Sequence, residues 1–200
     1  MRYTKIDMSD NFRKLNIYFD IDAIREAYRT AIEDIGFTGK LVNCISLTHS
    51  DSDKADPRGI FWTMNDDYEE IQVERFVDEQ AYKVFEPLLM NTYLKNVYDG
   101  LSQHFRLGRV RILKLDSRTS LSYHRDPEAR LHIPIITNPG ALMIVDKDAH
   151  HMKADGSVYY VDTTKYHTAL NGGNESRIHL VATILDESKE DELYTIYGGD

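Results

Sequence analysis

The sequence predicts a mainly β domain, a jelly roll with helices packed on one of its sheets. Eight short runs of alternating apolar and polar residues follow residue 108, turn residues separate them, and helical periodicity occurs only before them. With 200 residues, 42% hydrophobic and 28% charged, the composition is that of an ordinary globular domain. We expect one domain, with a helical and strand layer over 1–104, a β core over 105–185 and a polar tail over 186–200.

Two segments of the N-terminal half carry helical signals. Apolar residues over 20–35 recur with a period of 3.6, Asp20 is available as N-cap and Gly36 as a C-terminal stop. A second helical stretch is expected over 78–98, where Pro87 opens the first turn of a new helix. Both helical segments are expected to cover one sheet.

Between these helices the sequence predicts one strand and two acidic loops. Residues 41–47 form an apolar run typical of a strand. Residues 51–59 and 65–70 are polar and acidic, and they flank Ile60, Phe61 and Trp62. Phe61 and Trp62 are expected to form either a lid over a substrate or a packed aromatic anchor. The 51–56 run lacks the central Gly of a calcium loop, so it is interpreted as a solvated charge run.

The second half of the chain consists of short strands. Turns are marked by 138–140, by 155–156 and by 171–174, all of which contain Gly. The predicted strands are 109–116, 119–124, 130–137, 141–145, 151–153, 158–161, 166–170 and 177–185. Eight strands with such turns are typical of a jelly roll.

Charge and cysteine content exclude several classes of protein. The net charge is −9, and neither half of the chain has more basic than acidic residues, so no nucleic-acid partner is expected. No run reaches the roughly 18 apolar residues of a membrane span, and 1–15 lacks the apolar centre of a signal peptide, so we expect a cytoplasmic protein without a membrane. Cys44 is the only cysteine, so any metal must be held by His, Asp or Glu.

His124 and Asp126, followed 43 residues later by His167, have the composition of an iron site. Residues i and i+2 at a strand end point the same way, so the first two side chains can reach one ion and the later imidazole completes the set. Two His and one carboxylate form the facial triad of non-haem Fe(II) oxygenases, which leaves three coordination positions open. The triad therefore predicts chemistry on O₂.

Two strands share a pattern in which Arg and His alternate with aliphatic residues: Arg130 and His132 in one, Arg177 and His179 in the other. Such alternation also occurs on a half-exposed sheet, where the polar face meets water. If the triad faces inward, the alternation of side chains along the strand turns Arg177 inward as well. Burying a guanidinium without a partner destabilises the folded protein. No carboxylate shares its face, so a dicarboxylate ligand is the expected partner.

These motifs together resemble the aspartyl/asparaginyl β-hydroxylase family of Fe(II)/2-oxoglutarate-dependent oxygenases, which is related to bacterial proline hydroxylases. The resemblance covers about 105–185 and includes the 123–126, 130–134, 137–140 and 177–180 stretches with His167 and Asn171. It implies a double-stranded β-helix with His124, Asp126 and His167 on Fe(II).

The same resemblance implies positions for the cosubstrate. Arg177 would hold the distal carboxylate of 2-oxoglutarate, His132 would lie near its other end, and Arg130 would lie close to cosubstrate or substrate. His179 shares the face of Arg177 and is grouped with these cosubstrate residues. Some family members have no carboxylate at the position of Asp126, so their substrates are not carried over.

The sequence predicts a hydroxylase that uses Fe(II), 2-oxoglutarate and O₂ and releases succinate and CO₂. The resemblance alone implies that its substrate is an amino acid, free or in a peptide or protein. With Asp126 as third ligand no position is vacant for halide, which favours hydroxylation over halogenation. The alternatives are a cupin-like metalloenzyme that does not use 2-oxoglutarate and a catalytically silent sensor of metal and a small acid. His150 and His151 are expected to be solvated histidines rather than part of a site. His49 and His104 carry no signal that distinguishes a functional role from a structural one.

Overall fold

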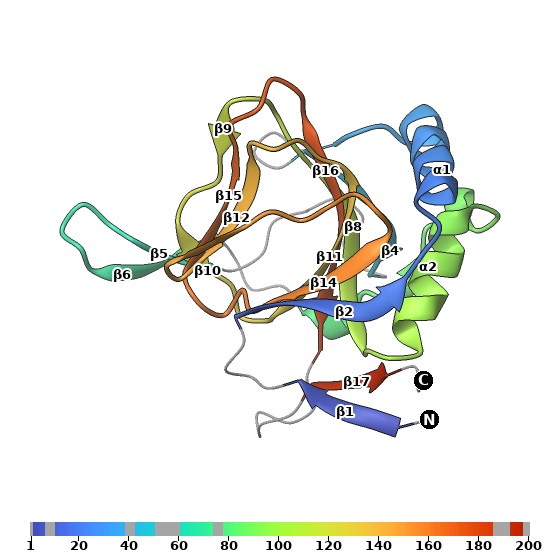
Figure 1. The fold of residues 1–200 in the computed structure, drawn as a ribbon, viewed down its shortest axis with the longest axis horizontal. Helices are drawn as coiled ribbons and strands as arrows, with labels where there is room; N and C mark the ends of the chain where they lie inside the picture. Colours follow the sequence, from blue (N-terminus) through green and yellow to red (C-terminus); the bar gives the residue numbers. More distant parts are fainter. Residues whose placement is uncertain are drawn as a thin grey trace.

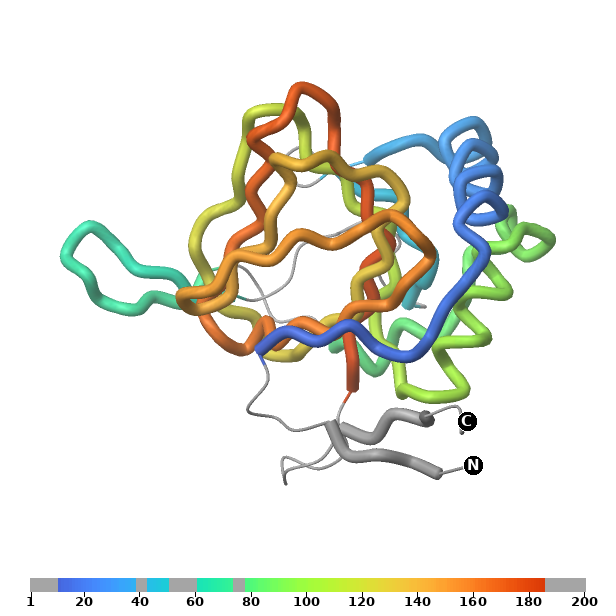
Figure 2. The backbone as a smooth tube through the Cα atoms, in the orientation of Figure 1, coloured from blue at the N-terminus to red at the C-terminus, as the bar shows by residue number. Residues whose placement is uncertain are grey.

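The computed structural model describes residues 11–38, 43–50, 61–73 and 78–185, and the backbone of 2–6 and 193–197. Two antiparallel sheets pack together, and two helices lie against the outer face of one of them (Figure 1). The smooth backbone trace in Figure 2 shows the same layers, with the two sheets side by side and the helices beyond one sheet. The mainly β fold with helices on one sheet is confirmed.

The sheet next to the helices has six strands in the order β2-β14-β11-β16-β8-β3. Its central strand β16 pairs with a neighbour on each edge, and its side chains are buried on both faces because the helices cover one face and the second sheet covers the other. The strands are β2 (Phe12–Tyr18), β3 (Asn43–Ser46), β8 (Leu107–Leu115), β11 (Arg130–Ile136), β14 (Ser157–Val161) and β16 (Arg177–Ile184).

The second sheet has the order β13-β12-β15-β10-β5-β6, and β9 pairs with β15 beside that path. Its strands are β5 (Phe61–Met64), β6 (Glu70–Val73), β9 (Thr119–Ser120), β10 (His124–Arg125), β12 (Ala141–Val145), β13 (Asp148–His150) and β15 (His167–Asn171). The β5–β6 hairpin projects away from the body of the protein (Figure 1). Two further strand pairs are β1 (Arg2–Ile6) with β17 (Leu193–Tyr197), and β4 (Thr48–His49) with β7 (Val84–Phe85).

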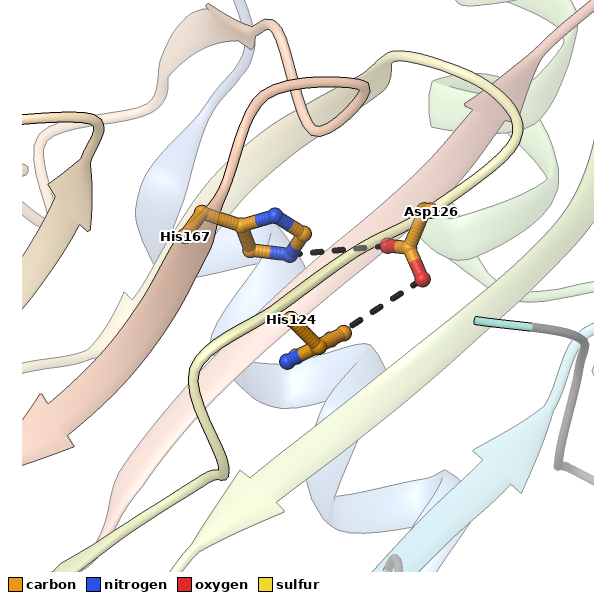
Figure 3. A group of neighbouring side chains, drawn as sticks. All are labelled: His124, Asp126 and His167. Carbon is orange, nitrogen blue, oxygen red and sulfur yellow. Dashed lines mark ion pairs between the residues drawn. The ribbon is translucent and has the colours of Figure 1, made fainter. Parts of the chain in front are cut away.

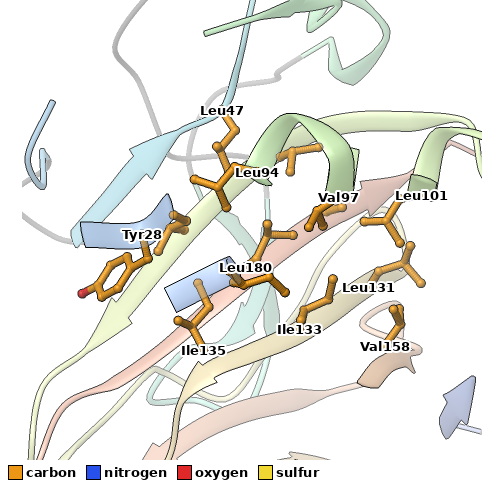
Figure 4. Close-up of a cluster of buried hydrophobic side chains, with 14 of the residues drawn as sticks. Tyr28, Leu47, Leu94, Val97, Leu101, Leu131, Ile133, Ile135, Val158 and Leu180 are labelled. Atoms are coloured by element: carbon orange, nitrogen blue, oxygen red, sulfur yellow. The ribbon is translucent and has the colours of Figure 1, made fainter. Parts of the chain in front are cut away.

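The main core lies between the helices and the six-stranded sheet. Helix α1 (Ile21–Asp34) begins where Asp20 accepts hydrogen bonds from the amides of Asp22 and Ala23, and Gly36 follows it with φ +75°. Helix α2 (Tyr93–Ser102) packs beside it, and one face of each helix is buried. These faces meet aliphatic side chains of β8, β11 and β16 (Figure 4). Helix α2 contributes Leu94, Val97 and Leu101, and the strands contribute Leu131, Ile133, Ile135 and Leu180. The expected covering of one sheet by helices is confirmed.

The expected helix over 78–98 is wrong in its first part. That region contains two 3-10 turns, η1 (Glu79–Ala81) and η2 (Pro87–Leu89), with β7 between them. Between these turns Val84 and Phe85 pair with His49 and Thr48 of β4, and this strand pairing takes the chain out of a helical path. The α-helix begins only at Tyr93, although Pro87 does open a helical turn as expected.

Several strand boundaries also differ from expectation. Residues 12–18, given no element from sequence, form β2. Residues 61–64 and 70–73 form a hairpin, whose turn at 65–69 lies within the expected 65–70 loop. The expected strand over 119–124 is two short strands, β9 and β10. The expected strand over 151–153 lies instead at 148–150, because a two-residue turn with Asp146 at φ +55° returns the chain at once from β12.

Two expectations concern residues that the structure describes in part or not at all. The 51–56 charge run lies outside the described residues, as does much of the 186–200 tail. Within that tail, however, 193–197 form β17, a strand that the sequence analysis did not predict. Among the described helices, neither has the length and apolar character needed to cross a bilayer.

Candidate metal and cosubstrate site

Three buried side chains of the second sheet converge on one point. The residues are His124 on β10, His167 on β15 and Asp126 just after β10, and their ligand atoms all lie within 4.8 Å of one another (Figure 3). His167 Nε2 is 3.5 Å from Asp126 Oδ2, and His124 Nε2 is 3.9 Å from Asp126 Oδ1. The two histidines are direct cross-strand partners, which sets their imidazoles side by side. The sequence prediction that these three side chains meet is confirmed.

Hydrogen bonds fix the same tautomer in both histidines. His124 Nδ1 lies 2.6 Å from the carbonyl oxygen of Ser122, and His167 Nδ1 lies 3.0 Å from that of Lys165. A carbonyl oxygen only accepts, so in each neutral ring the proton sits on Nδ1 and the Nε2 lone pair is free for a metal. This backbone support of the distal nitrogen is typical of histidines that bind metals.

Charge at the triad also favours a cation. Burial lowers the pKa of His167 to about 4, partly offset by the carboxylate of Asp126, so this imidazole is neutral at pH 7. Arg130 Nη2 lies 2.7 Å from Asp126 Oδ2 and holds the carboxylate in place. Arg130, expected near cosubstrate or substrate, therefore sits beside the metal-ligand set. Two neutral imidazoles and one carboxylate are a donor set suited to Fe(II).

The opposite wall of the inter-sheet space is formed by the six-stranded sheet and carries Arg177, His132 and His179. His132 is paired in register with Tyr159, and Arg177 with Leu115. Tyr159 and Leu115 belong to the small apolar cluster that also includes Val145 from the metal-bearing sheet. The Arg and His side chains thus face the second sheet, whereas the aliphatic residues between them face the helices. The predicted division of the two faces is confirmed.

Arg177 is a buried cation that meets no carboxylate among the described residues. Its Nη2 donates to Nδ1 of His179 at 3.0 Å, and burial lowers its pKa from 12.5 to about 10. Because the guanidinium only donates, neutral His179 carries its proton on Nε2, and that atom has no partner in the described structure. Both ring nitrogens of His132 are equally without partners.

These unpartnered groups fit a dicarboxylate. A buried guanidinium is costly unless an anion meets it, and bidentate binding to a carboxylate is its usual solution. The pKa of His132 is lowered well below its ordinary value by burial and then by the positive charges of Arg177 and of Arg130, which sits beside the triad. His132 is therefore near both Arg177 and the triad. A ligand with one carboxylate at Arg177 and its other end at the metal would pass His132.

Sequence reasoning missed a charged group on the same inward face. Arg109 and Arg111 of β8 are buried, and Glu79 pairs with Arg109. Burial, together with the nearby carboxylates of Glu79 and Asp126, raises the pKa of Glu128 to about 7. The signal was present, because Arg109 and Arg111 alternate with aliphatic residues as the Arg and His of β11 and β16 do. Glu79 carried no comparable signal.

The remaining candidates have other roles. The ring of Phe61 meets that of His124 edge-on at 5.2 Å, so Phe61 packs against the metal site, while Trp62 lies on the opposite face beneath Arg125. His150 stacks on Phe12, and His151 is exposed with Nδ1 bonded to a backbone carbonyl. His49 pairs with Glu86 at 2.7 Å. His104 is half-buried, and its Nδ1 has no described partner.

Comparison with solved structures shows the fold. A viral collagen prolyl hydroxylase from Paramecium bursaria Chlorella virus-1, in a 2-oxoglutarate complex, aligns with a TM-score of 0.51 and 10% identity over 90% of this chain and 97% of its own. A 2-oxoglutarate-Fe(II) oxygenase family oxidoreductase from Burkholderia pseudomallei aligns with a TM-score of 0.52 and 13% identity over 94% of this chain and 87% of its own. No curated protein matches the sequence significantly.

The family model described as aspartyl/asparaginyl β-hydroxylase matches residues 89–186. This segment includes α2, all three triad residues, and the strands β10, β15, β11 and β16 that carry the site. Over residues 89–186 the chain is thus similar to the aspartyl/asparaginyl β-hydroxylase family, and with its His-Asp-His triad it is an enzyme of the Fe(II)- and 2-oxoglutarate-dependent oxygenase class.

Proposed function

We propose that this enzyme hydroxylates a C–H bond of an amino acid, free or within a peptide or protein, with His124, Asp126 and His167 as the Fe(II) ligands and Arg177 as the anchor for 2-oxoglutarate. His132 and His179 complete the cosubstrate site in this proposal. The chain then acts as one oxygenase domain whose site lies between the two sheets. The choice of an amino acid as substrate rests on the family match.

The observation that carries the proposal is the buried Arg177, which meets no carboxylate in the part of the chain that the structure describes. It lies on the wall opposite a triad whose Nε2 lone pairs are available to a metal. The donors of Arg177, His179 and His132 together suit one carboxylate-bearing ligand. A sheet with only a structural role would pair this arginine, as Glu79 pairs Arg109. The arrangement is that of a preformed binding wall.

When bound, Fe(II) and 2-oxoglutarate supply the oxidation by O₂ that places a hydroxyl on the substrate and yields succinate and CO₂. The chain supplies binding, orientation and exclusion of water. Backbone carbonyls hold the two imidazoles in the tautomer that presents Nε2, and Arg130 holds Asp126. The occupied carboxylate position favours hydroxylation over halogenation.

The test is substrate-dependent succinate release. Purified enzyme with Fe(II), 2-oxoglutarate and O₂ is screened against free amino acids and against peptides from a host lysate, with His124→Ala as control. We expect succinate to form in step with a substrate mass increase of one oxygen, and only with the intact triad.

Other outcomes would identify the alternatives. O₂ consumption without succinate would indicate a cupin-like metalloenzyme. Binding of metal and a small acid without any turnover would indicate a sensor. Either result would refute the proposed hydroxylase.

A further inference from the structure

The strand that carries His124 is unusually short for a metal-ligand strand. β10 consists only of His124 and Arg125, and a single register pair, His124 with His167, joins it to β15. On its other side two pairs join it to β5, His124 with Thr63 and Arg125 with Trp62. So short a ladder gives the strand few main-chain hydrogen bonds. Side chains must contribute to its placement.

One carboxylate on the projecting hairpin connects the neighbours of both metal histidines. Glu70, the first residue of β6, accepts from Arg125 at 2.8 Å (Nε to Oε2) and 2.6 Å (Nη2 to Oε1). The same Oε2 accepts from the hydroxyl of Tyr166 at 2.7 Å. Arg125 directly follows His124, and Tyr166 directly precedes His167. Glu70 therefore ties together the two chain segments whose spacing sets the distance between the imidazoles.

An aromatic surface reinforces this connection. The guanidinium of Arg125 lies 4.4 Å from the ring centre of Trp62, so it is held by stacking as well as by the bidentate pair. Tyr123, on the other side of His124, stacks on Tyr166 with 5.3 Å between ring centres. Because residues alternate along a strand, these side chains lie on the outer face while the imidazoles point inward.

We infer that Glu70 is a positioning residue of the metal site: by bridging Arg125 and Tyr166 it sets the separation of His124 and His167. The Glu70 cluster, defined as Glu70, Arg125, Tyr166 and Trp62, thus lets the β5–β6 hairpin determine metal affinity from outside the site. The inference rests on the proposed assignment of the two histidines as metal ligands.

The ion pair is more than an ordinary surface contact. Exposed pairs usually add little to stability, but a bidentate pair within a network is the exception. The hydrogen bonds from Arg125 and Tyr166 lower the pKa of Glu70 to about 2, so the bridge stays charged at any pH at which the enzyme would work. Removing partners that orient metal ligands costs about 10–100-fold in affinity. Since Glu70 acts one residue away from each ligand, we expect about the lower limit, tenfold.

The experiment measures Co(II) binding to the apo protein by its visible absorption, which reports both affinity and ligand geometry and needs no turnover. The variants are Glu70→Ala, Tyr166→Phe and the double variant. Glu69→Ala is the matched control, because Glu69 lies on the same hairpin and its carboxylate accepts, among the described residues, only from the side-chain amide of Asn65, at 3.4 Å. We expect a Kd about tenfold higher and an altered absorption band for Glu70→Ala, a smaller effect for Tyr166→Phe, and wild-type values for Glu69→Ala.

The double variant tests whether the two residues act as one unit. If the Tyr166 hydroxyl acts through Glu70, then Glu70→Ala with Tyr166→Phe binds Co(II) no more weakly than Glu70→Ala. Should Glu70→Ala fail to fold, Tyr166→Phe alone decides, because it removes a single hydroxyl from the bridge. Wild-type Kd and spectrum in the folded Glu70 or Tyr166 variants would overturn the positioning role. Co(II) binding that survives His124→Ala unchanged would instead overturn the metal assignment itself.

Discussion

Replacing Arg177 with Met should strengthen the fold while it weakens cosubstrate binding. The guanidinium is buried, and burial lowers its pKa from 12.5 to about 10. At about 1.4 kcal/mol for each tenfold change in acid dissociation, the charged side chain destabilises the ligand-free fold by about 3 kcal/mol at pH 7. Met keeps the unbranched stem and removes the charge, so we expect the free energy of unfolding of the apo protein to rise by about 1–3 kcal/mol.

The same substitution removes the proposed partner of the 2-oxoglutarate carboxylate. Truncating one partner of a buried, hydrogen-bonded charge pair costs about 2 kcal/mol or more, so affinity for 2-oxoglutarate should fall at least about 30-fold. The two measurements are urea unfolding of the apo protein and anaerobic calorimetric titration of the Mn(II) form with 2-oxoglutarate. Arg29→Met, on the exposed face of α1, is the control.

The opposite pair of results would refute this reasoning. Loss of stability in Arg177→Met with unchanged 2-oxoglutarate affinity would mean that the arginine is a satisfied structural residue. The dicarboxylate site would then have to lie elsewhere, and the cupin-like alternative would gain support.

Three further predictions concern the triad and the fold. His124→Ala and His167→Ala should abolish turnover, whereas Asp126→Gly should weaken Fe(II) binding and keep partial turnover at high iron. Iron titration combined with succinate yield distinguishes these outcomes. Wild-type iron affinity in Asp126→Gly would show that Asp126 is no metal ligand. Burial lowers the pKa of His167 in the folded protein to about 4, so its contribution to the stability of the apo protein is present above pH 6.5 and is lost as the pH falls toward 4. Urea unfolding across this pH range should show a shallower loss of stability for His167→Gln than for the wild type. Equal losses would contradict the lowered pKa. Gly156 has φ +86°, and an added Cβ would overlap the carbonyl oxygen of Phe19. Gly156→Ala should therefore lower the free energy of unfolding, measured by heat or urea, by more than about 1 kcal/mol. Unchanged stability would show that the turn before β14 shifts to make room for the methyl group.

Features of the site that depend on local pattern could be predicted from sequence. Alternation with a period of two fixes which side chains share a strand face, so it correctly placed Arg177 and His179 together and opposite the aliphatic core. The His124 and Asp126 pair lies within three residues, and its side chains converge as expected. The N-cap and C-terminal Gly of α1 are equally local signals.

Only the tertiary structure determined the contacts between distant segments. Whether His124 stands opposite His167 depends on the register between their strands. The alternation of side chains does not determine this register, because sliding one strand by any even number of residues keeps every side chain on the same face. The pairing of β7 with β4 made the helical prediction wrong, because main-chain pairing with a strand distant in the sequence outweighed local propensity. Glu70 and Tyr166 are 96 residues apart in the sequence, and no local pattern around either residue predicts their contact. Sequence thus determined the chemistry and facing of each strand, while packing determined which strands meet.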